Sequence, residues 1–329
     1  MKSKEILFIV GMPRSGTKLL RDLLNRHAEV SVFPNESHVI PFFSERFERY
    51  GDVLIFSNFE KFYNDFINTT FYKRVSKKDF QVDLDDWFRR LSDNTFKEVL
   101  YAFFQIYKEK TDSQIVGDKT PSYISHIPLL VDLFPNAKFI HIYRDPRDYV
   151  LSMENAWNKN KYRSAQRWKI QINKFITDSK LVSKDNLFEV SYENLIDHPR
   201  DVMNKLCKFL KVNFSESMLK LNSPSENLGS AKGLLNIKSG NHSNWKNLLT
   251  EKEKIYIEKI TLSALKHYGY TSRENIEEID INKIKLFFYK IQDAFNLIKF
   301  HIRDSGGFIT GLKRVYEFVK HSALRGKKI

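Results

Sequence analysis

ILFIVGMPRSGTKLLRDLL, residues 6–24, decides the fold: an apolar run leads into a turn rich in Gly, Pro and Ser, and a helical period follows. The run predicts a buried strand, and the period predicts a helix directly after the turn. Gly11 and Gly16 let the backbone pass close to a ligand, and the amides of residues 14–17 converge at the positive end of the helix. The segment therefore predicts an anion-binding loop.

The spacing of this loop separates it from a metal-nucleotide site. G-x4-G matches the phosphate loop of ATP- and GTP-binding proteins, but Thr17 and Lys18 stand where that loop has Lys and then Ser or Thr. The hydroxyl after the Lys holds Mg²⁺ in those proteins, and here the charge has moved to Arg14 inside the turn. The order favours an anion bound by the protein's own cations without a metal, and it disfavours a kinase of the phosphate-loop class.

Two later segments carry phosphate chemistry of a similar kind. In KFIHIYRDPRDYVLSM (138–153), we expect a strand over 139–143, a turn, and a helix from Asp148 with Ser152 in its first turn. A guanidinium such as that of Arg144 offers a planar fork to phosphate oxygens, and the hydroxyl of Ser152 adds a neutral donor. The other segment is KSGNHSNWKN (238–247).

In this order, the three segments resemble sulfotransferases that use 3′-phosphoadenosine 5′-phosphosulfate (PAPS). Residues 11–17 resemble their 5′-phosphosulfate loop, Arg144 and Ser152 the pair that grips the 3′-phosphate, and 238–247 a later segment in which Ser239 replaces a basic residue. The resemblance covers about residues 5–270. It implies an α/β fold, with the phosphate loop after the first strand of a parallel four- or five-stranded sheet flanked by helices. It also implies PAPS as the donor, 3′-phosphoadenosine 5′-phosphate (PAP) as the product, and no metal.

The resemblance also implies which residues hold the donor. Tyr192 follows the expected strand LFEVS and resembles a family tyrosine near the adenine, although packing at the strand end is an equal alternative. The full set implied is Arg14, Ser15, Gly16, Thr17, Lys18, Arg144, Ser152, Tyr192, Lys238, Ser239 and Gly240.

Catalysis of sulfuryl transfer needs cations aimed at the charge that develops on the transferred group. Arg14 fits this role from inside the loop. Lys119, in GDKTPSYI (117–124), resembles the turn lysine of protein-tyrosine and glycosaminoglycan sulfotransferases that touches the transferring group. The alternative for Lys119 is an exposed lysine in a turn.

The acceptor hydroxyl needs a base. Glu36, in Glu-Ser-His-Val-Ile-Pro, resembles the base of the tyrosylprotein enzymes, while His38 is the rival and His126 and His242 are more remote candidates. The alternative for Glu36 is a helix cap. For the acceptor we expect a carbohydrate or glycoconjugate, with a peptide tyrosine as the alternative. An alternative of a different functional class is a catalytically silent PAPS-binding or membrane-associated scaffold.

Composition bounds the rest of the chain. Its 329 residues are 42% apolar and 14% aromatic, enough to bury a large core. The single Cys207 excludes a disulfide within the chain and suits a reducing compartment. The first apolar run is too short for a signal peptide or a membrane span, so we expect a cytoplasmic protein. We expect a sulfotransferase domain over 1–272, with a mostly helical insertion at about 42–113, and a basic helical extension over 273–329.

That extension concentrates the positive charge of the protein. Residues 281–329 carry eleven Lys and Arg against three acidic residues, in a chain of net charge +14. Two helices separated by 305–307 are expected, either packed on the domain or bound to an anionic membrane at the inner face. No nucleic-acid motif accompanies the charge, so a nucleic-acid partner is not expected. Helical spacing relates Ile284, Phe287, Phe288, Ile291, Phe295, Ile298 and Ile302.

Overall fold

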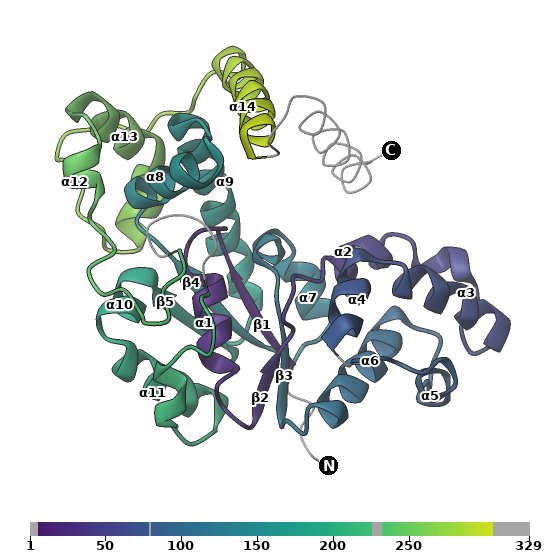
Figure 1. Cartoon of the computed structure of the whole chain (residues 1–329). Coiled ribbons are helices and arrows are strands. Elements are labelled where there is room, and N and C mark those ends of the chain that lie inside the picture. The colour runs from purple at the N-terminus through teal and green to yellow at the C-terminus, as the bar shows by residue number, and fades with distance from the viewer. Residues whose placement is uncertain (1–5, 79, 226–231, 305–329) are drawn as a thin grey trace. The chain divides into compact units, whose positions relative to one another are not determined.

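The computed structural model describes residues 6–78, 80–225 and 232–304, which form two compact units (Figure 1). The first unit holds residues 6–143, 174–225 and 232–239. The second holds residues 144–173 and 240–304.

The first unit is built on a five-stranded sheet in the order β2-β3-β1-β4-β5, in which every neighbouring pair of strands is parallel. The predicted parallel sheet is thereby confirmed. Parallel strands share one carboxyl edge, so the loops that leave β1, β3, β4 and β5 begin along the same side of the sheet. The strands are β1 (Ile6–Gly11), β2 (Val30–Val32), β3 (Ile115–Lys119), β4 (Lys138–Tyr143) and β5 (Leu187–Ser191).

The central strand β1 is buried along its whole length because helices cover both faces of the sheet. Leu7 and Ile9 belong to an apolar cluster with α1 (Thr17–Leu24), α10 (Tyr192–Asp197) and α11 (Pro199–Leu210). Phe8 points to the other face, where its ring contacts Phe104 of α6 (Phe96–Lys110) and the ring of Phe134 after α7 (Ile127–Leu133).

Helices occupy most of the segment at about 42–113. Rings from its helices and from Phe33 pack into one apolar cluster, in which Phe66 and Trp87 lie 5.0 Å apart between ring centroids. The helices are α2 (Val39–Ser44), α3 (Phe56–Ile67), α4 (Thr70–Val75), α5 (Leu84–Arg89) and α6. Short 3₁₀ helices are η1 (Phe47–Tyr50), η2 (Ser76–Lys78), η3 (Pro121–Ser125), η4 (Ser179–Leu181), η5 (Lys184–Asn186) and η6 (Glu216–Leu219).

The regular secondary structure of the second unit is helical in the part that the structure describes, with connecting segments such as 268–282 between the helices. Its helices are α8 (Pro146–Trp157), the first part of α9 (Lys161–Asp178), α12 (Trp245–Leu248), α13 (Glu251–His267) and α14 (Lys283–Asp304). α8 begins two residues earlier than the sequence predicts, because Pro146 occupies the first turn and Asp145 caps it by accepting a hydrogen bond from the Arg147 amide. Ser152 therefore lies in the second turn of α8, and the prediction that it lies in the first is wrong.

The first helix of the predicted extension is present as α14. The side chains of 297–304, which include Ile298 and Ile302, and the helix predicted after residue 307 lie outside the described residues. Within the described ranges, the helices fall short of the length and apolarity that a membrane span requires. Cys207 is buried with a free thiol.

Candidate active site

The phosphate loop joins β1 to α1 through backbone conformations that few residue types accept. Gly11, Arg14 and Gly16 have φ values of 155°, 70° and 88°. A Cβ on Gly11 would lie 2.3 Å from the Ile142 carbonyl oxygen of β4, so glycine is needed there for close approach as well as for conformation. The turn is thus fixed by the neighbouring strand before any ligand binds.

Ser15 gives this loop a group suited to an anion. Its side chain is fully buried, and its Oγ has no hydrogen-bond partner among the described residues. Buried hydroxyls are normally paired, so an unpaired one at the N-terminus of α1 fits the 5′-phosphosulfate predicted to bind there. Thr17 is buried beside it, while Arg14 and Lys18 are half-buried at the loop surface.

Tyr192, the first residue of α10, packs against the phosphate loop. A Cβ on Gly16 would lie 2.5 Å from Cδ2 of the Tyr192 ring, so the ring fills the space that the glycine leaves. The residue is buried in the core cluster. This packing at the strand end is one of the two roles considered from the sequence, and the adenine contact stays a prediction.

At the carboxyl end of β3, Lys119 and Glu36 form an ion pair. Lys119 stands in register with Ile9 of β1, and its side chain is only 4% exposed. Its Nζ lies 2.8 Å from Glu36 Oε1. The alternative of an exposed turn lysine is therefore wrong. Glu36 does not cap α2 either, since that helix begins after His38 without a side-chain cap.

The ion pair controls the charge of the carboxylate. Partial burial alone would raise the pKa of Glu36, but the hydrogen bond from His38 and the charge of Lys119 outweigh it and lower this pKa to about 2. Burial lowers the pKa of Lys119, and the charge of Glu36 opposes that shift. Glu36 is therefore ionised throughout the physiological pH range, although 41% of its side chain remains exposed.

A buried polar network fixes the chain on both sides of this pair. The Ser37 hydroxyl contacts the Asp118 carboxylate and lies 2.7 Å from the Tyr123 hydroxyl, and the Ser37 amide donates to Thr120 Oγ1 at 2.9 Å. Burial raises the pKa of Asp118 to about 6, although two hydroxyl donors oppose this. Because Ser37 follows Glu36 and Asp118 precedes Lys119, the network holds both partners of the ion pair in place. Nothing in the sequence alone predicts this role for Ser37 or Asp118.

The two main candidates for the base lie next to each other. His38 Nε2 is 3.3 Å from Glu36 Oε2, and His38 Nδ1 is 3.2 Å from Ser122 Oγ. His126 precedes α7 in the same unit, whereas His242 belongs to the second unit with its Nδ1 3.0 Å from Ser243 Oγ. Glu36 and His38 therefore form a coupled pair in which either group can accept a proton.

In the second unit, the two segments predicted to hold the 3′-phosphate meet. Arg144 Nη2 donates to the Asn241 carbonyl at 3.2 Å. Asp148 of α8, 2% exposed, accepts hydrogen bonds from the backbone amides of Ser243 at 2.5 Å and Trp245 at 3.0 Å. Asp148 thereby ties the 238–247 segment to the helix that follows Arg144.

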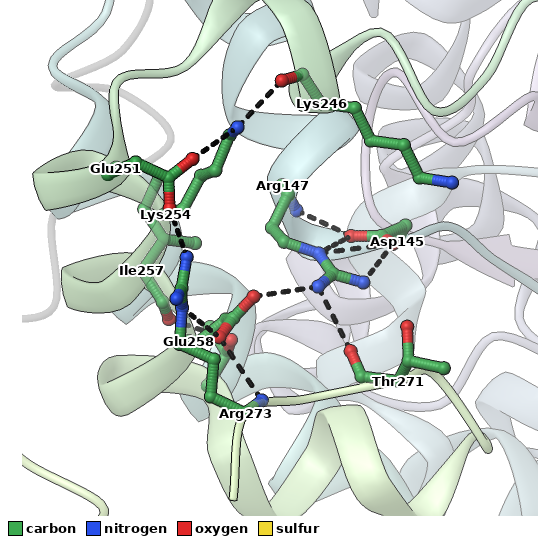
Figure 2. A network of polar contacts seen from close by, with 10 residues as sticks. Asp145, Arg147, Lys246, Glu251, Lys254, Ile257, Glu258, Thr271 and Arg273 are labelled. Carbon is green, nitrogen blue, oxygen red and sulfur yellow. Dashed lines mark hydrogen bonds and ion pairs between the residues drawn. The ribbon is translucent and has the colours of Figure 1, made fainter. Parts of the chain in front are cut away.

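Arg147 is the centre of a second set of polar contacts, drawn in Figure 2. Its guanidinium donates to Asp145 at 2.7 Å, to Glu258 of α13 at 2.8 Å and to the Thr271 carbonyl at 3.0 Å, and it lies 3.7 Å from the centroid of the Trp245 ring. Breaking any one of these contacts would leave a buried charge uncompensated, which is energetically costly. The contacts therefore oppose movement of the start of α8.

The rest of the 238–247 segment divides between the units. Lys238 and Ser239 belong to the first unit, where Ser239 Oγ donates to Asp197 Oδ1 at 3.0 Å, and Gly240 begins the second. Gly240 has φ of 70° with open space at its Cβ position. Their contact with a 3′-phosphate stays a prediction. Among the described residues, no three His, Cys, Asp or Glu side chains gather as a metal site.

Comparison with known proteins agrees with this geometry. The model of the sulfotransferase family matches residues 7–216, which include the phosphate loop, the Glu36–Lys119 pair and Arg144. The chain belongs to the sulfotransferase family. This sulfotransferase is 27% identical over 227 residues to protein-tyrosine sulfotransferase 1 of Danio rerio, and 24% identical over 221 residues to protein-tyrosine sulfotransferase of Drosophila melanogaster. The matches cover 66% and 65% of the chain but only 56% and 39% of those relatives.

Among solved structures, the sulfotransferase domain from the curacin biosynthetic pathway aligns with a TM-score of 0.56 at 20% identity, over 83% of this chain and all of that one. The sulfotransferase domain of the olefin synthase from Synechococcus PCC 7002 aligns with a TM-score of 0.54 at 23% identity, over 82% and 96%. Both share the fold of this sulfotransferase.

Proposed function

We propose that this protein transfers the sulfuryl group of PAPS to an acceptor hydroxyl, and that the acceptor is the phenol of a peptide tyrosine. The observation that carries the proposal is the Lys119–Glu36 ion pair, held at the carboxyl end of β3 next to the strand that ends in the phosphate loop. A cation for developing charge and a carboxylate for a departing proton are the two groups that sulfuryl transfer requires.

The roles follow from the groups present. Bound PAPS would supply the sulfuryl group; the loop residues Arg14 to Lys18 would hold its 5′-phosphosulfate. The 3′-phosphate would be held by Arg144 and Ser152, with Lys238, Ser239 and Gly240. Tyr192 would lie near the adenine.

Glu36 would accept the proton of the acceptor hydroxyl, and Lys119 would regulate its basicity. While His38 and Lys119 both interact with it, Glu36 is ionised but weakly basic, with a pKa of about 2. Any interaction that draws the ammonium of Lys119 toward another anion weakens this hydrogen bond and raises the pKa of Glu36. The carboxylate would thus become a stronger base when Lys119 engages the donor.

Two observations support a tyrosine acceptor. Two of the similar proteins are protein-tyrosine sulfotransferases, and the segment Glu-Ser-His-Val-Ile-Pro that holds Glu36 resembles the base segment of the tyrosylprotein enzymes. A phenol, with a pKa of about 10, also loses its proton far more readily than a sugar hydroxyl, which suits a weakly basic carboxylate. The second candidate, an anionic carbohydrate or glycoconjugate, is favoured by the net charge of +14.

The test is incubation of the protein with labelled PAPS and matched panels of tyrosine peptides, glycans and glycolipids, followed by mass spectrometry. We expect sulfated tyrosine, lost in Glu36→Gln and kept in the control Glu45→Gln, whose carboxylate is exposed and pairs with Arg46. If only glycans were sulfated, the proposal of a tyrosine acceptor would be rejected in favour of a carbohydrate acceptor. PAP binding without any turnover would favour the scaffold, and a preference for ATP with Mg²⁺ over PAP would refute the donor.

A further inference from the structure

Helix α14 of the second unit is docked through its polar face. Asp293, 3% exposed, accepts a hydrogen bond of 2.7 Å from the Asn160 amide and pairs with Arg163. Gln292 accepts from the Asn160 side chain at 2.8 Å, and Asn296 donates to the Asn158 carbonyl at 2.8 Å. An amphipathic helix on a soluble domain usually docks through its apolar face instead.

The apolar side of α14 consequently faces solvent. The apolar stripe, defined as Ile284, Phe287, Phe288, Ile291 and Phe295, follows one side of the helix at intervals of three and four residues. Four of its members are 60–66% exposed, and Ile291 is 38% exposed. Of the two alternatives for the extension, packing of this stripe on the domain is therefore wrong over the described residues. Single exposed apolar residues are normal, but a contiguous stripe marks an interaction surface.

A cationic groove of about 590 Å³ runs beside the stripe, within the same unit. Phe287 belongs to the stripe and also lines the groove, and exposed Ile170 of α9 contributes a further apolar side chain to the groove. The carboxylate in the lining is that of Asp293, already paired with Arg163. The groove is lined by the cations Lys159, Arg163, Arg167, Lys283 and Lys290.

These cations are poorly compensated. No carboxylate in the described part of the chain lies within ion-pair distance of Lys159, Arg167, Lys283 or Lys290. Burial lowers the pKa of Lys159, and the charges of Arg163 and Arg167 lower it further, against the opposing effect of Asp293. An anion in the groove would relieve this repulsion.

We propose that α14 and the groove beside it form a docking surface for an anionic lipid bilayer. Aromatic side chains of the stripe would enter the boundary between headgroups and acyl chains, while lipid phosphates would occupy the groove. Lys283 and Lys290 lie on the groove side of the stripe, and exposed Lys285 lies on the other side, as in helices that lie in the plane of a membrane. A second copy of the chain fits less well, because a symmetric contact would bring two cationic grooves together.

The experiment is co-sedimentation of the full chain with phosphatidylcholine vesicles, with and without phosphatidylglycerol. We expect binding to the anionic vesicles only, weakened by salt because exposed charges are screened. Phe287→Ser with Phe295→Ser should weaken binding on the order of tenfold or more, since the stripe is lost. Lys283→Gln with Lys290→Gln should weaken it by about fivefold for each cation removed.

Matched controls distinguish binding through this surface from nonspecific electrostatic or hydrophobic adsorption to the vesicles. Leu181→Ser removes an apolar side chain of similar exposure, 58%, and Lys208→Gln with Lys252→Gln removes two exposed cations elsewhere. Both controls should bind vesicles as the unchanged chain does, and PAP affinity should be equal in all variants. The proposal is overturned if the full chain ignores anionic vesicles, if the stripe variant binds them normally, or if light scattering shows that the stripe variant instead breaks a dimer.

Discussion

Asp148→Asn tests whether the second unit prepares a 3′-phosphate site. Asp148 accepts from two backbone amides of the 238–247 segment, at 2.5 and 3.0 Å, and is almost fully buried. Asn keeps one acceptor oxygen and presents an NH₂ group to the other amide, so one buried N–H loses its partner. Loss of a hydrogen bond to a charged group, with an unsatisfied donor left behind, costs about 3 kcal/mol.

A second effect has the opposite sign. Asp148 lies close enough to Arg144 for their charges to interact, so removal of the carboxylate makes the site more positive. At a separation of several ångströms near the surface, removing the Asp148 charge should make the binding free energy of an anionic ligand more favourable by about 1 kcal/mol. The positional loss is larger, and the net of about 2 kcal/mol predicts PAP binding roughly 30-fold weaker.

The assay is isothermal titration with PAP and with adenosine 5′-monophosphate, which lacks the 3′-phosphate. If Asp148 positions the 3′-phosphate segments, the variant loses affinity for PAP but not for the monophosphate, and the control Asp280→Asn, which removes an exposed carboxylate from the same unit, changes neither. Equal losses for both nucleotides, which leave the ratio of the two affinities unchanged, would mean that Asp148 only maintains the fold and would refute the reasoning.

Three further predictions concern the remaining parts of the site. Glu36→Gln should slow turnover by roughly 10² to 10⁴ at unchanged PAP affinity, whereas His38→Ala should not. With the pKa of Glu36 lowered from 4.5 to about 2, the base stays ionised as pH falls from 8 to 5, so kcat/KM should show no acidic limb there; a limb near neutrality would assign the base to a histidine. Gly16→Ala combines a φ of 88° with overlap on the Tyr192 ring and should lower the melting temperature on the order of 10 °C, less than additively with Tyr192→Ala; an unchanged melting temperature would contradict the packing. Arg144→Ala should weaken PAP on the order of 10²-fold and leave adenosine 5′-monophosphate unaffected, and titration showing equal affinity for PAP would reject its role.

Local signals in the sequence were sufficient for the sheet and the phosphate loop. An apolar run, a glycine turn and a helical period are read within 19 residues, and the structure has β1, the loop and α1 there. The pairing of Arg147 with Glu258 joins residues 111 positions apart, and nothing local in either segment specifies it. The signal for the start of α8 is local too, since Asp145 is the cap and Pro146 the first residue of the helix, whereas the sequence prediction begins the helix at Asp148.

Periodicity also has a limit that α14 illustrates. The spacing of Phe287, Ile291 and Phe295 predicts a helix with an apolar side, and both are present. It does not predict which side docks, because that depends on the partners available: Asn158, Asn160 and Arg163 offer polar groups to Asp293 and Asn296. Since the hydrogen bonds form between side chains and a backbone distant in sequence, the exposed stripe could be identified only from the structure.

Two separate parts of the proposed machinery, the base and the 3′-phosphate segments, each rest on a buried carboxylate that would not itself touch the ligand. Asp118 holds the loop of Glu36 against β3, and Asp148 holds the 238–247 segment against α8. Burial opposes ionisation of both, raising their pKa values, and the hydroxyl and amide donors around them compensate only in part. A carboxylate kept in so unfavourable a position is stabilised mainly by the segments that it joins, so any change that loosens those segments makes its protonation easier. The geometry of the site and the ionisation of its two supporting carboxylates are therefore coupled, each within its own unit.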